Sequence, residues 1–184
     1  YILRATGFAH LSRSFGQKLR ANAHDPQVKA MHKADQLLDD EQYEPARRSY
    51  LAVLQAMEKD ARFYENWIPT VVNSLGVAAY RLQRYGEAIG YFERSLSKAR
   101  LVGDRQNTAD ILENIGESHF KDGKFKAALT HCRDSLRINE ALGRRDRLLE
   151  NHYWAALAAQ KLKREKAATT HLKQAKSLLK ALYA

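Results

Sequence analysis

Cysteine is almost absent from this 184-residue sequence. Because Cys132 stands alone, an internal disulfide and a thiolate metal site are excluded, and a reducing compartment, the cytoplasm, is favoured. Uncharged segments are short as well: the longest runs from Trp67 to Tyr80 and is interrupted by Asn73 and Ser74, so no insertion into a membrane is expected. With three prolines, nine glycines and 45% hydrophobic residues, the chain is too apolar and regular for disorder and predicts one substantial core.

Sequence signatures of catalysis are missing too. The chain has no glycine-rich phosphate loop and no serine nucleophile elbow. None of its seven histidines forms the i, i+4 pair of a helical zinc site. We therefore expect a protein that is not an enzyme and that holds neither a metal nor a cofactor.

Acidic residues are scarce at both ends of the chain. Residues 1–24 contain four basic side chains and no acid, and residues 160–184 contain seven basic side chains against Glu165. These ends account for the formal net charge of +10, because residues 25–159 carry 20 basic and 20 acidic side chains. A neutral body with two basic ends is a poor match to a continuous phosphate-binding stripe, which argues against nucleic acid as the main partner.

A repeat of 40 to 42 residues organises most of the chain. Residues 74–92 read SLGVAAYRLQRYGEAIGYF and residues 114–132 read NIGESHFKDGKFKAALTHC, with few identities but the same spacing of small and large side chains. Weaker copies occupy residues 32–50 and 154–172. One small residue recurs at Ala34, Gly76, Gly116 and Ala156, a second at Ala46, Ala88, Ala128 and Ala168, and a large one at Tyr50, Phe92, Cys132 and Leu172.

Each copy predicts two antiparallel helices. The small side chains allow the two backbones to approach closely, and the large residues fill the space beside them. Tyr43, Tyr85 and Phe125 mark the turn between the helices. Gly103 and Gly143 are expected to end the second helix of successive pairs. Because a single pair cannot bury both of its faces, the pairs should stack into an array.

This pattern resembles the tetratricopeptide repeat family, in which Leu-Gly, aromatic, Ala and aromatic residues recur at these intervals. Leu75, Gly76, Tyr85, Ala88 and Phe92 match that signature. The longer period is similar to that of the extended repeats in kinesin light chains and in some bacterial peptide-sensing regulators. The resemblance implies an all-α fold, a right-handed α-solenoid of stacked antiparallel helix pairs, with four repeats at about 26–60, 67–102, 106–142 and 146–182.

Residues 1–24 fall outside this register and precede the repeat domain of residues 25–184. Leu11, Phe15 and Leu19 are spaced as on one face of an amphipathic helix, which predicts a cap or the last helix of a preceding repeat. A transit peptide is the alternative, because the segment contains Arg and Ser but no acid. Since the first residue is Tyr1, we expect a fragment or a processed product.

In the family that the chain resembles, the first helix of each pair lines a concave groove that holds a peptide or an extended segment. The same positions here offer aromatic and aliphatic anchors, acids, and amides able to grip a peptide backbone. The predicted groove residues are Asn73, Val77, Tyr80 and Arg81; Asp110, Glu113, Asn114, Glu117, Phe120 and Lys121; and Glu150, Tyr153, Trp154, Leu157 and Lys161.

Charges in this groove allow two interpretations. Four carboxylates either attract a partner with a basic segment or pair with basic residues of the neighbouring repeat. They are Asp110, Glu113, Glu117 and Glu150. Basic residues also recur every forty positions, either as a track for an acidic partner or as solvated helix ends. These residues are Arg81, Lys121 and Lys161.

The leading hypothesis is a non-enzymatic adaptor or scaffold that binds a peptide or protein segment in the groove. The first alternative is a peptide-sensing regulatory domain of a larger regulator, and the second is nucleic-acid binding through the basic ends. The last predicted helix carries Leu178, Leu179, Leu182 and Tyr183, an apolar edge that predicts either a continuing chain or a homodimer through this helix.

Overall fold

The computed structural model describes residues 24–183, which form eight helices and no strand within that range. The helices follow one another as four pairs. They are α2 (Pro26–Asp39) with α3 (Tyr43–Glu58), α4 (Ile68–Arg81) with α5 (Tyr85–Leu101), α6 (Arg105–Lys121) with α7 (Phe125–Leu142), and α8 (Arg145–Lys161) with α9 (Glu165–Tyr183). The sequence predicts a cap, the last helix of a preceding repeat or a transit peptide for residues 1–24. Except for His24, this segment lies outside the described residues.

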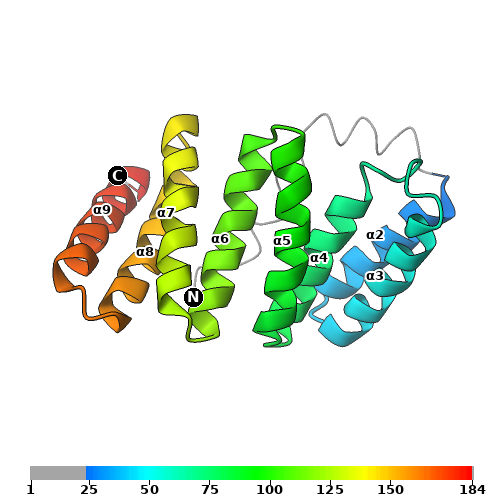
Figure 1. Ribbon diagram of the computed structural model, residues 1–184, viewed down its shortest axis with the longest axis horizontal. Helices are drawn as coiled ribbons and strands as arrows, with labels where there is room; N and C mark the ends of the chain where they lie inside the picture. The colour runs from blue at the N-terminus through cyan, green and yellow to red at the C-terminus, as the bar shows by residue number, and fades with distance from the viewer. Residues whose placement is uncertain (1–23, 184) are drawn as a thin grey trace.

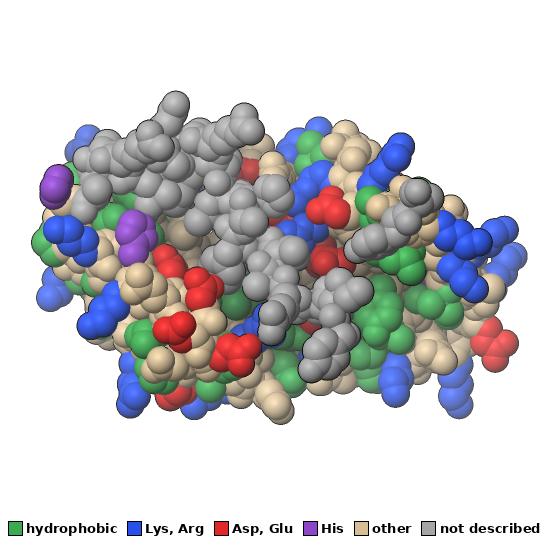
Figure 2. Space-filling model, turned by 180° about the vertical axis from the view of Figure 1, so that it is seen from behind, with side chains coloured by type: hydrophobic (Ala, Val, Ile, Leu, Met, Phe, Trp, Pro, Cys, Tyr) green, Lys and Arg blue, Asp and Glu red, His purple; other side chains and the backbone are tan. Residues whose placement is uncertain are grey.

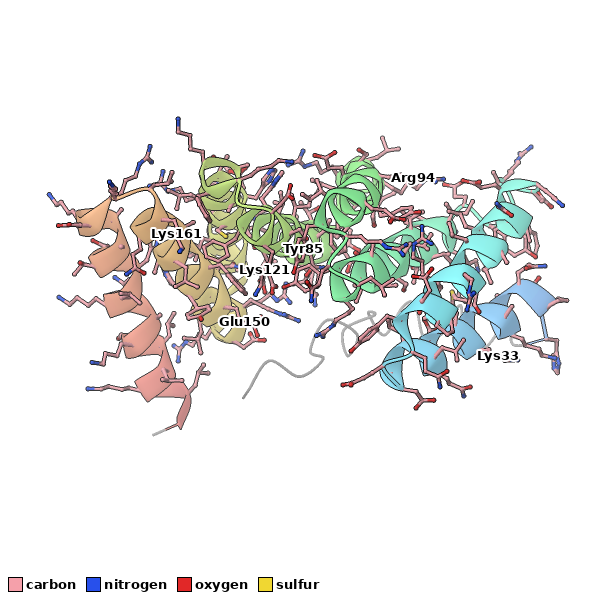
Figure 3. All side chains as sticks on the ribbon, turned by 90° about the horizontal axis from the view of Figure 1, so that it is seen from below. Lys33, Tyr85, Arg94, Lys121, Glu150 and Lys161 are labelled. Atoms are coloured by element: carbon pink, nitrogen blue, oxygen red, sulfur yellow. The ribbon has the colours of Figure 1, made fainter. Side chains whose placement is uncertain are left out.

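The four pairs stack in chain order into an elongated array (Figure 1). Each helix packs against the next one along the chain, and α2 also contacts α4 as α6 contacts α8. Seen from below, the array is arched, with the α2 and α9 ends displaced to the same side of the middle helices (Figure 3). The all-α solenoid of stacked helix pairs that the sequence predicts is confirmed.

Local sequence explains where several helices begin and end. Asp25 caps α2, because its carboxylate accepts hydrogen bonds from the backbone N–H groups of Gln27 at 2.8 Å and Val28 at 3.0 Å. The Asp104 side chain caps α6 in the same way. Gly143 ends α7 with a φ of 66°, a left-handed conformation that glycine adopts without strain.

The repeat's small and large residues meet in the core as predicted, except in the last pair. Gly76 lies against the Phe92 ring, and Gly116 lies against Cys132. Phe92 and Cys132 are buried. Leu172, which holds the same position on α9, is 52% exposed, so the expectation that it fills a core space is wrong. The reason is that α7 is covered by α8, whereas no described helix covers the corresponding face of α9.

Hydrogen bonds repeat along the array as well. The Ser95 hydroxyl donates to the Pro69 carbonyl at 3.1 Å, and the Ser135 hydroxyl lies 2.8 Å from the Ala109 carbonyl in the next repeat. Each bond ties a second helix to the start of the first helix of its own pair. In addition, Arg47 of α3 pairs with Glu87 of α5 at 2.5 Å and links the first two repeats. None of the described helices combines the length and the apolar character that a membrane span requires.

Candidate functional site

The candidate site is the inner side of the arch, which is formed by α4, α6 and α8. Figure 3 places Glu150 of α8 on this inner side and Arg94 of α5 on the opposite, outer side. We call the predicted groove residues on these three helices the inner surface. Two surface hollows among the described residues are lined by other side chains: one by parts of 61–72 with Arg94 and Lys98, the other by Arg133 and parts of 164–171.

Most of the predicted groove residues reach solvent. Arg81, Lys121, Tyr153 and Lys161 are exposed, with Tyr153 at 44%. The half-buried residues are Asn73, Val77, Tyr80, Asp110, Asn114, Glu117, Phe120, Glu150 and Leu157. The inner surface therefore carries apolar side chains from three successive repeats.

Two of the predicted groove residues are buried, which corrects the sequence-based set. Trp154 is 5% exposed because its ring packs against Phe120, at 5.4 Å between ring centroids, and joins the apolar cluster of α7 and α8. Glu113 is 6% exposed and faces α8, where Asn151 donates to its carboxylate at 2.7 Å. Neither side chain offers the broad contact area that its sequence position predicts.

Aromatic side chains are held in place from behind the inner surface. Tyr80 of α4 lies edge-on to the turn residue Tyr85, at 5.5 Å between centroids. One repeat later, Phe120 and the turn residue Phe125 hold the equivalent positions, and their ring centroids lie 5.4 Å apart. The Tyr80 hydroxyl also donates a hydrogen bond to Glu117 of α6. Contacts of this kind restrict the rotamers of the rings and pre-organise the surface.

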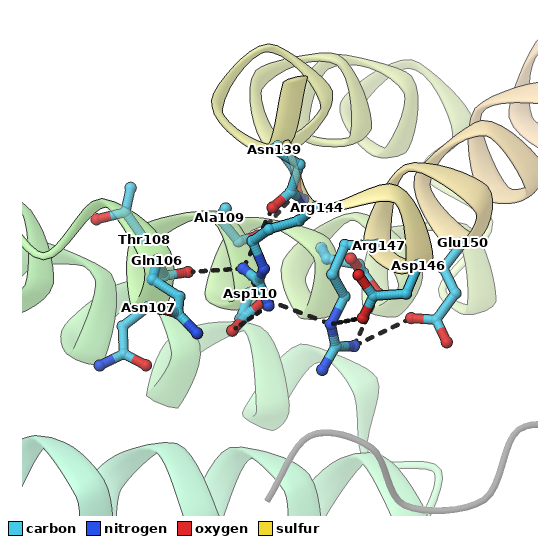
Figure 4. Close-up of polar contacts among 12 residues, drawn as sticks. Gln106, Asn107, Thr108, Ala109, Asp110, Asn139, Arg144, Asp146, Arg147 and Glu150 are labelled. Carbon is cyan, nitrogen blue, oxygen red and sulfur yellow. Dashed lines mark hydrogen bonds and ion pairs between the residues drawn. The ribbon is translucent and has the colours of Figure 1, made fainter. Parts of the chain in front are cut away.

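The carboxylates of α6 and α8 pair with two arginines that are not among the predicted groove residues (Figure 4). Arg144 lies 2.8 Å from Asp110, and Arg147 lies 3.1 Å from Glu150 and 3.7 Å from Glu113. For Asp110 and Glu113 the second interpretation, pairing with basic residues of the neighbouring repeat, is the one observed, whereas Glu150 pairs with Arg147 of its own helix. Glu117 accepts from Tyr80 instead.

A signal for Arg147 was present in the sequence but required the repeat register. Trp67, Asn107 and Arg147 occupy one position of the repeat, forty residues apart. Trp67 is 4% exposed and Arg147 is 6% exposed, so this position is buried in both repeats. Arginine is usually exposed to solvent, so the residue type alone predicts an exposed side chain at position 147. The repeat register predicts a buried one.

Burial raises the pKa of two carboxyl groups in this cluster. The pKa of Glu113 is raised well above its ordinary value, first by burial and then by a hydrogen bond to Glu150, with Arg147 acting in the opposite direction. Burial likewise raises the pKa of Glu117. In both carboxyl groups the protonated form is therefore favoured more than in a solvent-exposed glutamate.

A buried polar network fixes α7 against α8. Asn139 and Asn151 are fully buried, and the Asn139 amide donates to the Asn151 side-chain oxygen at 2.9 Å. Ser135 lies 3.0 Å from the same oxygen. Since buried amides need all of their partners, this network specifies one register between the third and fourth repeats.

Among the described residues, four histidines pair with one another and the cysteine is buried. His119 stacks on His131, at 5.3 Å between centroids, and His152 shares a 2.9 Å hydrogen bond between Nδ1 atoms with His171. Within residues 24–183, no three or more His, Cys, Asp or Glu side chains gather as metal ligands would. Burial raises the pKa of Cys132 to about 12, so its thiol stays protonated.

Comparisons with known proteins agree with this architecture. The model of the tetratricopeptide repeat family matches residues 67–141. A stretch of 88 residues is 27% identical to Regulatory protein AfsR of Streptomyces coelicolor, and this match covers 48% of the chain but only 9% of that protein. The chain therefore corresponds to a small part of this curated relative.

Two solved structures share the fold. Aspartyl phosphate phosphatase F from Bacillus subtilis superposes with a TM-score of 0.76 at 15% identity, over 92% of this chain and 45% of that one. BtubC (BKLC) from P. vanneervenii superposes with a TM-score of 0.61 at 17% identity, over 94% and 89% of the two chains. These two likenesses show the fold, and the family match identifies residues 67–141 as tetratricopeptide repeats.

Proposed function

We propose that this protein is a non-enzymatic interaction scaffold that binds an extended protein segment or peptide along the inner surface of α4, α6 and α8. One observation carries the proposal. Val77, Tyr80, Phe120, Tyr153 and Leu157 come from three successive repeats, lie on the first helix of each pair, and keep part of their surface in solvent. An extended segment can contact successive repeats in turn, so these side chains supply spaced apolar anchors.

Polar groups of the inner surface support a peptide ligand. The Asn73 side-chain oxygen is buried and has no hydrogen-bond partner among the described residues. A backbone N–H of a bound segment is a suitable donor to it, because buried polar atoms are rarely left unpaired. The packed rings and the buried amide network hold the surface rigid, which lowers the entropy lost on binding.

A basic side chain in the partner is the finer part of the proposal. Asp110 and Glu150 keep about a fifth to a quarter of their side-chain surface exposed, at 22% and 24%. Arg144 and Arg147 already neutralise part of this charge, so one or two cations, rather than a long basic tract, complement what is left. Glu117 and Glu150 are the expected contacts, because both keep part of their surface in solvent.

A second candidate function is an interaction module of a larger regulator that responds to a peptide. The match to a protein named as a regulatory protein, over 9% of its length, favours this candidate. The two candidates differ in the structural consequence of binding. A sensor is expected to change the curvature of its array, so that its radius of gyration in small-angle scattering falls with peptide, whereas a static scaffold keeps its radius unchanged. A location in the cytoplasm remains a prediction, and the predicted homodimer through α9 is an alternative that sedimentation velocity tests.

The proposal is tested by a Tyr80→Ala, Tyr153→Ala double variant in a pull-down, followed by titration of the partner recovered with the wild-type protein. We expect at least about a tenfold loss of affinity, because each truncated ring of a binding hot spot weakens binding by about 1–4 kcal/mol. Phe63→Ala is the matched control: this ring is 56% exposed but lies outside the inner surface, between α3 and α4. Circular dichroism verifies that helicity is unchanged.

Full affinity of the double variant contradicts the proposal, and an equal loss in Phe63→Ala shows that the effect is not specific to the inner surface. A Glu117→Gln variant tests the basic partner side chain separately. Its affinity should fall several-fold at about 50 mM salt and less at high salt, where charge pairs are screened. Equal affinity of Glu117→Gln and wild type at low salt refutes the basic contact but leaves the apolar anchors standing.

A further inference from the structure

Helix α9 carries the positions that stack one repeat on the next, but with different contents. Forty residues earlier, α7 has Leu129, Cys132, Leu136 and Asn139 at these positions, and all four are buried. On α9 the same positions are Thr169, Leu172, Lys176 and Leu179, and all four are at least partly exposed. We call these four residues of α9, with the neighbouring Lys173 and Lys180, the outer α9 face.

Helix α8 shows what fits such a face. Leu129 and Cys132 of α7 pack in one apolar cluster with Trp154, Ala155 and Ala158 of α8. The equivalent surface of α9 can therefore pack against one further helix. On this surface Leu172 is 52% exposed and Leu179 is 46% exposed. In the described part of the chain, the helix packed against α9 is α8, which lies on its other side.

The charge of the outer α9 face is one-sided. Lys173, Lys176 and Lys180 are exposed along it, while Glu165 is the only acid of the helix. Viewed from behind the array, Lys and Arg side chains gather at the end of the molecule that α9 forms (Figure 2). A helix seated on Leu172 and Leu179 would lie beside this row of cations, so carboxylates on that helix would be favoured.

The repeat position that holds Lys176 in α9 makes the need for an acidic partner specific. Leu96 and Leu136 occupy it in the second and third repeats, and each is 6% exposed. Leu96 packs in the cluster that holds Ile111 and Leu112 of the following helix. In α9 the residue is Lys176, so an apolar helix of the same kind would bury an ammonium group without a partner. A carboxylate opposite Lys176 removes that penalty.

The same features argue against two other occupants. A second copy of α9 would bring its own lysines beside Lys173, Lys176 and Lys180, and like charges repel at short range. A membrane surface takes a helix with a wide apolar face. The apolar positions Ala168 and Ala175 of α9 are buried in the array, which leaves a narrow stripe of leucines for a partner.

We propose that the outer α9 face binds an amphipathic helix of a partner protein, packed as α8 packs on α7, with its apolar stripe on Leu172 and Leu179 and its Asp or Glu side chains opposite Lys173, Lys176 and Lys180. This site is separate from the inner surface and takes a partner of opposite chemistry. The protein would then join two partners, a segment with a basic side chain along the arch and an acidic helix at the α9 end.

The test uses two synthetic helical peptides, each long enough for roughly five helical turns. Both carry leucines at helical spacing; one has Glu at the flanking positions and the other has Lys. Affinity for the whole chain is measured by fluorescence anisotropy of the labelled peptides. We expect the wild type to bind the Glu peptide at least about tenfold more tightly than the Lys peptide.

Variants of the chain separate charge from apolar contact. Charge reversal in Lys173→Glu, Lys176→Glu, Lys180→Glu should invert the preference between the two peptides. Leu172→Asp, Leu179→Asp should lose at least about tenfold with the Glu peptide. Leu101→Asp is the matched control and should bind as wild type, because Leu101 is 79% exposed at the end of α5. Tyr80→Ala, Tyr153→Ala should also bind as wild type, which distinguishes this site from the inner surface.

Several outcomes would overturn the proposal. One is equal affinity of the wild type for both peptides, and another is an equal loss in Leu101→Asp. Dimerisation in sedimentation velocity that Leu172→Asp, Leu179→Asp abolishes would identify a second copy as the occupant. Binding to vesicles of phosphatidylcholine with phosphatidylserine, without binding to the Glu peptide, would identify a membrane surface. Thermal melts of each variant verify that an observed loss does not come from unfolding.

Discussion

At the scale of single residues, the close approach of paired helices depends on two glycines. A Cβ atom added at Gly76 would lie 2.5 Å from the Phe92 ring, and one added at Gly116 would lie 2.9 Å from the Cys132 sulfur and 3.3 Å from its backbone nitrogen. Such distances are well inside van der Waals contact. The glycines therefore set the separation between the first and second helix in the two central repeats.

Gly76→Ala should consequently destabilise the protein by about 1–3 kcal/mol, because a buried methyl group forces the Phe92 ring out of its rotamer. Gly90→Ala is the matched control. No atom lies within 4 Å of a Cβ at Gly90, and this residue is exposed on α5, so the change should stabilise by about 0.5–1 kcal/mol through helix propensity. Urea unfolding curves of both variants check the difference in sign. A neutral Gly76→Ala would mean that α4 and α5 lie farther apart.

At the scale of helices, the register of the repeat was sufficient to predict the helix pairs, the turns between them and most buried small residues. It placed Tyr80, Phe120 and Tyr153 on equivalent first helices, where they are found. It could not predict that Glu113 turns towards Asn151 or that Arg147 pairs with Glu113. Those contacts depend on side-chain rotamers across an interface between repeats, and a repeat pattern in one sequence carries no information about them.

The packing of α9 on α8 should depend on pH through His152 and His171. Burial, and then the neighbouring His171, lower the pKa of His152 to about 4. Burial, and then Arg133 of α7, lower the pKa of His171. At these two histidines the unfolded chain, with a histidine pKa near 6.5, binds more protons than the folded one, so their contribution to the free energy of unfolding is complete above about pH 7 and falls as pH drops towards 4.

The size of this effect is limited by solvent. Without solvent screening, the lowered pKa of His152 would change the free energy of unfolding by about 3 kcal/mol between high and low pH. Because the ring is only half-buried, screening reduces this change to about 1 kcal/mol. Thermal melts at pH 7 and pH 5 measure the change. His152→Leu, His171→Leu should reduce the dependence, because His119 and His131 also have lowered pKa values, whereas His32→Leu, at an exposed histidine of α2, should preserve it. A double variant with the same slope as wild type would assign the dependence to other groups.

At the scale of the whole molecule, stability should be graded along the array because each repeat contacts only its neighbours. The same register position illustrates the gradient. Phe92 is 1% exposed between α4 and α6, whereas Leu172 is 52% exposed on α9. Truncation of Phe92 to alanine should cost about 3–5 kcal/mol, as for other buried phenylalanines. Truncation of Leu172 should cost less than about 1 kcal/mol, as at other exposed sites.

Hydrogen exchange can measure this gradient without a variant. Backbone amides of α9 should exchange at least about tenfold faster than those of α5 and α6, because α9 opens by losing one interface and the central helices must lose two. Addition of the Glu peptide should slow exchange in α9 and leave α4 unchanged, since an occupied outer face gives α9 the second interface that α7 already has. Equal protection of all eight described helices would instead mean that the array unfolds as one cooperative unit. In that case α9 does not open by itself, and a partner helix on the outer α9 face could not slow its exchange selectively.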